Sequence, residues 1–510
     1  MIGRVRRPSG TLARATTKRL IDALMSMLRA ALVVVALTIP AASLAGQATV
    51  AAPPPEPAVT VWNARNWTRA EVWRFFEPPA GGGDNDYVYA ANRFQGGFRR
   101  TARRYEVTAA FQYVQFGGLP TNAVGPGPLG AGAVYFAHAG RSDSRQVYLR
   151  YLNLRLKDVA PGLAIQAGRM AYASGSETVS GDPKIEAVKR QHVDARLIGE
   201  FEWSLYQRAY DGVRADLARP GWSLTAAAVQ PTQGGFEDAA GLMMRDVAVL
   251  SSTVGLRPGV VIPHVELQGF AFRYLDHRGV TARADNTGRA ADAVDVAVNS
   301  FGATLVGASP NRDGGQWDAM LWLVGQSGSW YGQTHRGFSL AAEVGYQWTE
   351  APWRLWLRGG FLQASGDDDP ADDRHDTFFQ MLPTVRRYAQ TAGYSQMNNT
   401  DVFAQALLRP SPALSLRIDV RRVGLASARD MWYFGSGATQ SRGNLFGFST
   451  RPSNGATHLA SIAETSADYT VSRRWSVNGY VGVAKGGQVI RRAFAGSTMV
   501  FAYLENVLQF

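Results

Sequence analysis

Apolar and polar residues alternate along much of the chain, most strictly in the segment Phe338–Leu362. Two alternating stretches flank the tight turn Glu350–Pro352, with Trp348 and Trp353 on either side of it. A period of two places alternate side chains on opposite faces of a sheet, so the segment predicts a β-hairpin with one apolar and one polar face. Tryptophans where a strand leaves lipid for water are typical of a transmembrane β-barrel. For this hairpin alone, a soluble sheet packed on a core is the alternative.

Read over the whole chain, the alternation predicts eighteen strands. Connections after even-numbered strands are short, whereas those after odd-numbered strands are mostly long and rich in Gly, Asp, Asn, Ser or Pro. A soluble sandwich has no reason to sort loop length in this way, but an outer-membrane barrel has short periplasmic turns and long extracellular loops. The fold prediction is therefore all-β, a transmembrane antiparallel β-barrel of 18 strands over residues 66–510. The predicted strands are 66–77, 87–99, 105–116, 144–157, 163–170, 205–218, 221–230, 245–256, 260–274, 298–308, 315–327, 337–349, 353–364, 400–409, 413–423, 457–470, 473–484 and 499–510.

The first 45 residues have the pattern of a secretory signal. Arg29 supplies the positive charge, Ala30–Thr38 the apolar stretch, and Ser43–Ala45 the small residues that precede a cleavage site. The apolar run is too short to span a bilayer as a helix, although a membrane anchor is the alternative. Residues 46–65, which include a proline-rich run, are predicted to be a periplasmic leader. Both ends of the barrel are then expected in the periplasm, as an even strand number requires.

The signal segment changes the meaning of the charge. It holds seven of the 53 basic residues and one of the 41 acidic ones, so the rest of the chain carries a net charge of +6 rather than +12. Nucleic-acid binding, which needs a clustered basic surface, is not expected. Only four lysines remain, and the other bases are arginine, which forms bidentate pairs with carboxylates; a GC-rich genome explains the same bias. The chain has no cysteine, which excludes disulfides, thiolate metal sites and cysteine nucleophiles.

Two runs of residues form distinctive motifs. They are Arg196-Leu-Ile-Gly199 with Trp203 and Arg208-Ala-Tyr-Asp-Gly-Val-Arg214, and then Ser365-Gly-Asp-Asp-Asp-Pro370 with Thr377-Phe378 and Leu382-Pro383-Thr384. Both resemble the alginate export family of outer-membrane porins. Gly168-Arg169 is similar to that family's Gly-Arg at a strand end, although Met170 stands where a Gln is typical. The resemblance implies an eighteen-stranded barrel with an arginine-lined lumen that passes an acidic polysaccharide outward.

Charged residues of the inward face are the candidate pore-lining and substrate-binding groups. A polyuronate carries one carboxylate per sugar, so its passage needs cations that attract it and sites weak enough to release it. Two long loops, 171–204 and 365–399, are expected to fold inward and narrow the pore. The alternative role for each charged residue is an arginine–acid pair that only cross-links the wall. The candidates are Arg155, Lys157, Arg208, Arg214, Asp216, Glu343, Arg354, Arg358, Arg417, Asp419 and Arg421.

The predicted function is an outer-membrane channel of a Gram-negative-type bacterium that passes an anionic, alginate-like polysaccharide outward. The alternative is a general anion-selective porin for small acidic solutes or oligosaccharides. No nucleophile elbow and no His-Glu-x-x-His motif occurs, so an enzyme is not expected. No cofactor or metal is predicted, although the acidic run Asp367–Asp373 leaves calcium as an alternative. The expected partners are outer-membrane lipid, the polysaccharide and periplasmic export proteins, and the expected state is a monomer.

Overall fold

The chain divides at Glu56 into two units, and the second, Pro57–Phe510, is described below. The predicted signal segment and residues 46–56 of the predicted leader lie outside the described residues. The computed structural model describes residues 57–123, 131–202, 204–236, 239–281, 285–286, 293–384, 389–391, 393–435, 437–443 and 446–510.

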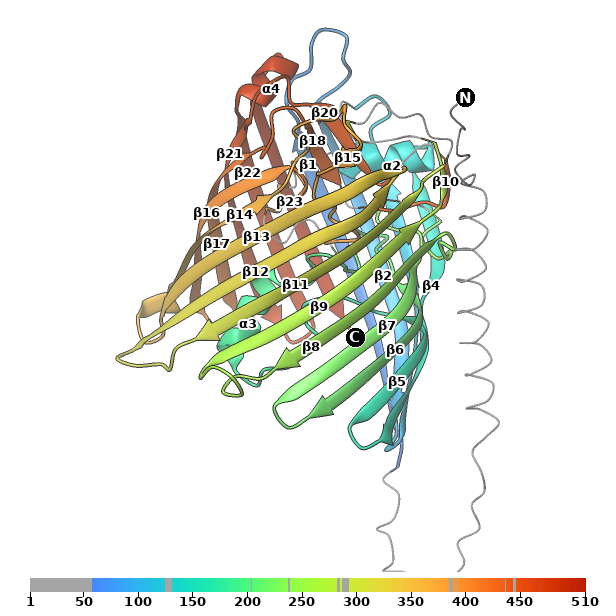
Figure 1. Ribbon diagram of the computed structural model, residues 1–510, viewed down its shortest axis with the longest axis vertical. Helices are drawn as coiled ribbons and strands as arrows, with labels where there is room; N and C mark the ends of the chain where they lie inside the picture. Colours follow the sequence, from blue (N-terminus) through green and yellow to red (C-terminus); the bar gives the residue numbers. More distant parts are fainter. Residues whose placement is uncertain are drawn as a thin grey trace, which may run out of the picture. The chain divides into compact units, whose positions relative to one another are not determined.

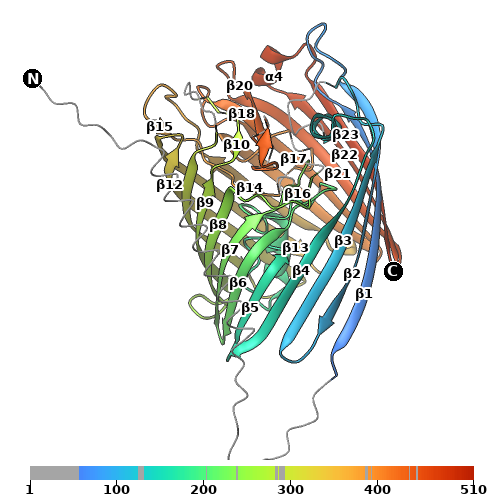
Figure 2. The ribbon, with the colours of Figure 1, turned by 90° about the vertical axis from the view of Figure 1, so that its right-hand side faces the viewer.

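The second unit is a closed, antiparallel β-barrel of 18 strands (Figure 1). Each strand pairs with its neighbour in the chain, and the last strand pairs with the first, from Arg65 with Gln509 to Arg74 with Val500 (Figure 2). This closed ring confirms the predicted fold. A barrel in lipid must close in this way, because closure leaves no unpaired sheet edge. The strands are β1 (Val59–Arg74), β2 (Asp86–Thr101), β3 (Tyr105–Gly117), β4 (Ser144–Ala160), β5 (Leu163–Met170), β6 (Tyr210–Arg219), β7 (Trp222–Pro231), β8 (Val247–Leu256), β9 (Val265–Asp276), β11 (Val296–Ala308), β12 (Gly315–Trp330), β13 (Gln333–Trp348), β14 (Trp356–Ala364), β16 (Asn399–Ser411), β17 (Leu414–Gly424), β21 (His458–Ser472), β22 (Trp475–Gly486) and β23 (Thr498–Gln509).

Smaller elements lie in the connections between barrel strands. A two-residue strand, β15, extends the main sheet by pairing in parallel with β13. Among the described residues, no helix is long and apolar enough to cross a membrane. The smaller elements are α2 (Ala131–Ala139), α3 (Pro183–His192), β10 (Gly279–Val280), the 3-10 turn η2 (Pro352–Arg354), β15 (Arg374–His375), β18 (Met431–Gly435), β19 (Arg442–Gly443), β20 (Phe448–Pro452) and α4 (Gln488–Ala493).

The hairpin of β13 and β14 has the predicted two faces. Val344 and Phe361 point outward and are 52% and 42% exposed, whereas Glu343 and Arg358 point inward and are buried. Outward apolar and inward polar side chains are what a lipid-spanning wall requires. The same pattern recurs around the ring, where the exposed large apolar residues belong largely to strands.

As predicted, the connections after even-numbered barrel strands are short, and those after odd-numbered strands are mostly long. The barrel therefore has a short-turn end and a long-loop end (Figure 1). The connection between β12 and β13 is an exception at the long-loop end, because only Tyr331 and Gly332 separate the two strands. Both have positive φ, +49° and +80°, which is the type I′ geometry of a two-residue hairpin.

The first strand begins earlier than predicted. Residues 59–65 were expected to belong to the leader, but they pair with β2, from Val59 opposite Thr101 to Arg65 opposite Gln95. Proline, which cannot donate to a strand ladder, stops at Pro57, so the strand is free to begin two residues later.

Two long loops fold into the barrel, as expected. Ile185 of the loop after β5 and Phe378 of the loop after β14 belong to one buried apolar cluster with inward side chains of β6 to β16. Inside the barrel the two loops pair with each other, the N–H of Leu382 donating to the carbonyl of Leu197 at 2.8 Å. The interior is therefore partly filled by apolar packing, which an alternation of polar inward residues alone does not predict.

Candidate functional site inside the barrel

Helix α3 lies inside the ring of strands, toward the short-turn end, and packs against β11 and β12 (Figure 1). Its start follows from the sequence. Asp182 caps it by accepting hydrogen bonds from the N–H groups of Lys184 and Ile185, and Pro183 occupies the first turn. The helix thus begins at a fixed residue and presents its basic side chains to the wall.

Three side chains of α3 reach carboxylates of three wall strands. Lys184 pairs with Asp318 of β12 at 3.2 Å, and Lys189 pairs with Glu266 of β9 at 2.9 Å. His192 hydrogen-bonds to Glu343 of β13 at 2.7 Å. These three helix residues span about 140° of the helix circumference at 3.6 residues per turn, so one broad face of α3 makes all three contacts. We call these three pairs the α3 contacts.

Arg358 of β14 completes this network. Its guanidinium donates to Asp318 at 3.1 Å and lies 3.0 Å from a carboxylate oxygen of Glu343. The indole N–H of Trp356 also donates to Asp318, at 2.6 Å. The side chains of Arg358, Asp318 and Glu343 are fully buried, so the wall arginine and α3 share two carboxylates away from solvent. Of the eleven candidates, Glu343 and Arg358 therefore serve as an anchor for the inserted helix.

Burial sets the protonation of the helix side chains. It lowers the pKa of His192 to about 4, because the loss of solvation outweighs the attraction of Glu343 and nearby arginines oppose a further positive charge. Burial also lowers the pKa of Lys184 to about 8, against the attraction of Asp318. At neutral pH, His192 is thus an uncharged hydrogen-bond partner, and Lys184 remains mostly protonated.

A second cluster lies on β4, β6 and β7. Arg155 donates to one oxygen of Asp216 at 2.6 Å, while Arg214 and Thr225 each donate to its other oxygen at 2.8 Å. Glu177 of the inserted loop interacts electrostatically with Arg214, and burial raises its pKa. The side chains of Arg155 and Arg214 are 28% and 20% exposed, in contrast to the fully buried Arg358. Two partly exposed guanidinium groups therefore share the single carboxylate of Asp216 on the inner wall.

A third cluster lies on β16 and β17. Arg417 donates to Asp419, and Arg421 donates to Asp401 at 2.7 Å and lies 3.7 Å from Asp419. Arg421 is fully buried, whereas Arg417 is 17% exposed. Two bases and two acids face one another, so this cluster balances its own charge and cross-links the wall.

Three candidates lie elsewhere than predicted or at the rim. Arg354 was expected in the lumen wall but lies in η2, where it is exposed. Trp353 and Arg354 have positive φ, +66° and +47°, and these turn conformations end the period of two before β14 begins. Arg208 was expected in a strand but precedes β6, buried with its guanidinium 5.2 Å from the ring of Phe201. Lys157 is near the short-turn end and donates to the carbonyl of Ala102.

The alternation missed several charged groups of the candidate site. Lys184, Lys189 and His192 lie in a loop that it does not describe, although the Asp182-Pro183 pair was an available helix-start signal. Arg169, which was predicted only as part of the Gly-Arg pair at a strand end, pairs with Asp211 at 2.7 Å. Gly168, next to it, has φ +114°, a conformation that interrupts the alternation.

The acidic run Asp367–Asp373 lies in the loop after β14. Asp367 is buried, and its N–H donates to Asp430 at 2.9 Å. Burial, with Asp430 and other nearby acids, raises the pKa of Asp367 to about 6. Among the described residues, no three His, Cys, Asp or Glu side chains are grouped so as to hold a metal ion.

A known protein family matches most of the chain. The family model described as alginate export matches residues 79–503. The chain belongs to the alginate export family. This confirms the resemblance of the two sequence motifs, and it identifies the protein as an outer-membrane channel rather than an enzyme.

Solved structures share the fold of this alginate export family member at low sequence identity. OccAB2 of Acinetobacter baumannii has a TM-score of 0.54 at 7% identity, over 88% of this chain and 98% of that chain. OpdK of Pseudomonas aeruginosa, solved with vanillate, has a TM-score of 0.53 at 10% identity over the same shares. OccK9 (OpdG) of the same organism has a TM-score of 0.53 at 9% identity, over 89% and 98%. No curated protein matches the chain.

Proposed function

We propose that this channel passes an anionic polysaccharide, an alginate-like polyuronate, outward across the outer membrane. The observation that carries the proposal is the cluster of Arg155, Arg214 and Asp216, in which two partly exposed guanidinium groups share one carboxylate. A partly exposed guanidinium on the inner wall attracts a carboxylate, and its existing pairing with Asp216 keeps each contact weak enough to release. Membership of the alginate export family supports the same substrate class.

Planar bilayer recordings with purified protein test the proposal. We expect an anion preference that falls at least about twofold in the double variant Arg155→Gln/Arg214→Gln, because partly exposed cations near the permeation path set the sign of the selectivity. Oligouronates should block the wild-type current, and neutral oligosaccharides of equal length should not. Arg354→Gln is the matched control, since Arg354 is an exposed arginine in the turn between β13 and β14. Unchanged selectivity and block in the double variant would contradict the proposed substrate path.

Uptake of small acidic solutes is the second candidate. The barrel interior is partly packed by the inserted loops, which favours small solutes over a polymer. OpdK, which has a similar fold, was crystallised with vanillate, a small carboxylate. Liposomes that contain the channel distinguish the two functions. Permeation of monomeric uronate without block by long oligouronates supports uptake, whereas block that strengthens with chain length supports export.

A further inference from the structure

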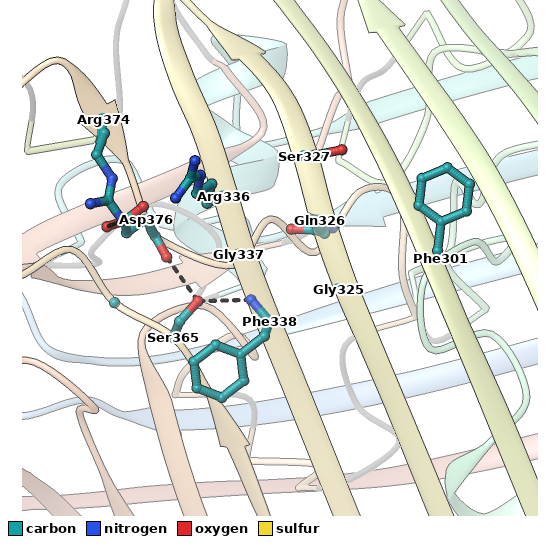
Figure 3. A pocket seen from close by; sticks show the side chains of 11 residues that line it. Phe301, Gly325, Gln326, Ser327, Arg336, Gly337, Phe338, Ser365, Arg374 and Asp376 are labelled. Carbon is teal, nitrogen blue, oxygen red and sulfur yellow. Dashed lines mark hydrogen bonds and ion pairs between the residues drawn. The ribbon is translucent and has the colours of Figure 1, made fainter.

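The outer face of the barrel has a groove of about 620 Å³ near the long-loop end (Figure 3). Phe301 of β11 is opposite Gly325 of β12, which in turn is opposite Phe338 of β13. The two phenylalanines are 59% and 50% exposed, so they are on the lipid-facing side of the wall. A side chain added at Gly325 would meet nothing within 4 Å, so this glycine leaves an open slot between two aromatic rings.

The groove ends at two arginines. Arg336 of β13 and Arg374 of β15 are exposed, and Figure 3 shows them together with Asp376 at one end of the groove. Arg374 pairs with Asp376 at 2.9 Å, whereas no described residue forms an ion pair with Arg336. The groove therefore combines an apolar slot with an unneutralised positive charge at its end.

The position of the groove matches a membrane boundary. Outward residues of β13 are apolar or aromatic from Trp348 to Phe338, and the next outward residue is Arg336. Ten residues of strand are about 34 Å long, which at a tilt of about 45° is about 24 Å of membrane depth, close to the apolar band of a transmembrane barrel. Arg336 thus lies just beyond the apolar band, at the depth of lipid headgroups.

The strand β13 changes its pairing partner at this point of the wall. β13 pairs with β14 from Ser339 onward, but nearer the long-loop end it pairs with β15 instead. Ser365 closes the junction, because its hydroxyl donates to the carbonyl of Asp376 and accepts from the N–H of Phe338 (Figure 3). The hollow is therefore built into the backbone and does not depend on one side-chain rotamer.

We propose that this groove binds a phosphate-bearing lipid of the leaflet on the long-loop side. One acyl chain lies over Gly325 between Phe301 and Phe338, and the phosphate lies between Arg336 and Arg374. Arginine suits this role because its planar fork donates two hydrogen bonds to a phosphate. The proposal is independent of the solute that the channel carries.

Native mass spectrometry of the full chain in detergent tests the site, with dioleoyl phosphatidic acid and dioleoyl phosphatidylcholine as probes. The two lipids have the same acyl chains and differ in headgroup charge. We expect the wild type to bind phosphatidic acid at least about fivefold more tightly than phosphatidylcholine. The preference should fall below about twofold in Arg336→Gln/Arg374→Gln. Gly325→Leu, which fills the slot, should weaken both lipids, and Arg354→Gln should match the wild type.

Three results would overturn the proposal. The first is an undiminished preference in Arg336→Gln/Arg374→Gln. The second is displacement of phosphatidic acid by an equal concentration of inorganic phosphate, with Gly325→Leu unaffected, which would indicate an anion site without a lipid. The third is displacement by oligouronate, which would assign the arginines to the polymer. Unfolding curves of each variant show whether lost binding reflects lost folding.

Discussion

Arg358 illustrates how burial changes the role of a lumen arginine. It is fully buried between Glu343 and Asp318, whereas Arg354, four residues earlier, is exposed in a turn. Sequence parity gave both residues the same role, because it reports which face a side chain takes and not what covers that face. The two arginines are therefore a natural pair for separating an anchoring charge from a solvated one.

Replacement of Arg358 by Met should destabilise the barrel by about 3–5 kcal/mol, because it leaves two buried carboxylates without their guanidinium partner. Arg354→Met should change stability by less than about 0.5 kcal/mol, as surface substitutions usually do. Thermal unfolding in detergent micelles, followed by circular dichroism, measures both. Equal midpoints for the two variants would show that the buried network contributes little.

His192 makes the docking of α3 dependent on pH. The folded protein lowers its pKa from 6.5 to about 4. As the pH falls from 6.5 to 4, His192 becomes protonated in the undocked state but stays neutral in the docked state. Docking therefore weakens over that range of pH. Amide exchange of residues 183–192 should therefore be faster at pH 4.5 than at pH 7, beyond the intrinsic effect of pH.

The variant His192→Gln supplies the control for this pH dependence. Glutamine keeps a hydrogen-bond donor toward Glu343 but has no proton to gain in that window. Its exchange should depend on pH less steeply than that of the wild type. Glu343 is present in both proteins, so its own titration contributes equally to both profiles. If the two profiles are the same, groups other than His192 control the docking.

At the scale of elements, α3 is held by pairs rather than by strand ladders. The α3 contacts use carboxylates of β9, β12 and β13, near the short-turn end of the barrel. Each pair joins a loop element to a rigid wall, so each can be weakened without breaking a backbone hydrogen bond of a strand.

The double variant Glu266→Gln/Asp318→Asn should release α3 from two of its three wall carboxylates. Single-channel conductance should then rise by at least about twofold or become noisier, because α3 is held less firmly inside the barrel. Breaking a buried ion pair by removing one partner costs about 3–5 kcal/mol, which is several times the thermal energy. Asp468→Asn, on the wall strand β21, is the matched control, because the side chain of Asp468 accepts a hydrogen bond from Asn478 of β22 and is not one of the carboxylates in the α3 contacts. A conductance equal to that of the control would place α3 outside the path.

The strands were predictable because the wall separates lipid from interior at every second residue. The hairpin of β13 and β14 obeys this rule over Phe338–Trp348, and β23 closes on β1 as expected. The site was less predictable, since the packing partners of inward residues come from loops distant in sequence. Ile185 and Phe378 illustrate this, because they fill the interior from two connections whose burial depends on the closed ring.

At the scale of the whole molecule, the charged pairs inside the barrel are of two kinds, fully buried and partly exposed. Fully buried pairs such as Arg421 with Asp401 neutralise themselves, while the partly exposed Arg155 and Arg214 share one carboxylate. Only partly exposed charges such as the second kind are accessible to ions in solution. Selectivity and stability should therefore respond differently to salt, because screening acts on exposed charges far more than on buried pairs.

The anion preference of the channel should fall as salt rises, while its unfolding temperature stays nearly constant. The screening length is about 10 Å at 0.1 M salt and about 3 Å at 1 M, so an exposed guanidinium acts over a much shorter range in the stronger salt. We expect the permeability ratio of anion to cation, from reversal potentials, to fall by about half over that range. Arg155→Gln/Arg214→Gln should show little further fall. A preference that persists unchanged at 1 M salt would mean that selection arises at a desolvated contact or by size, and the partly exposed arginines would then not determine which solute passes.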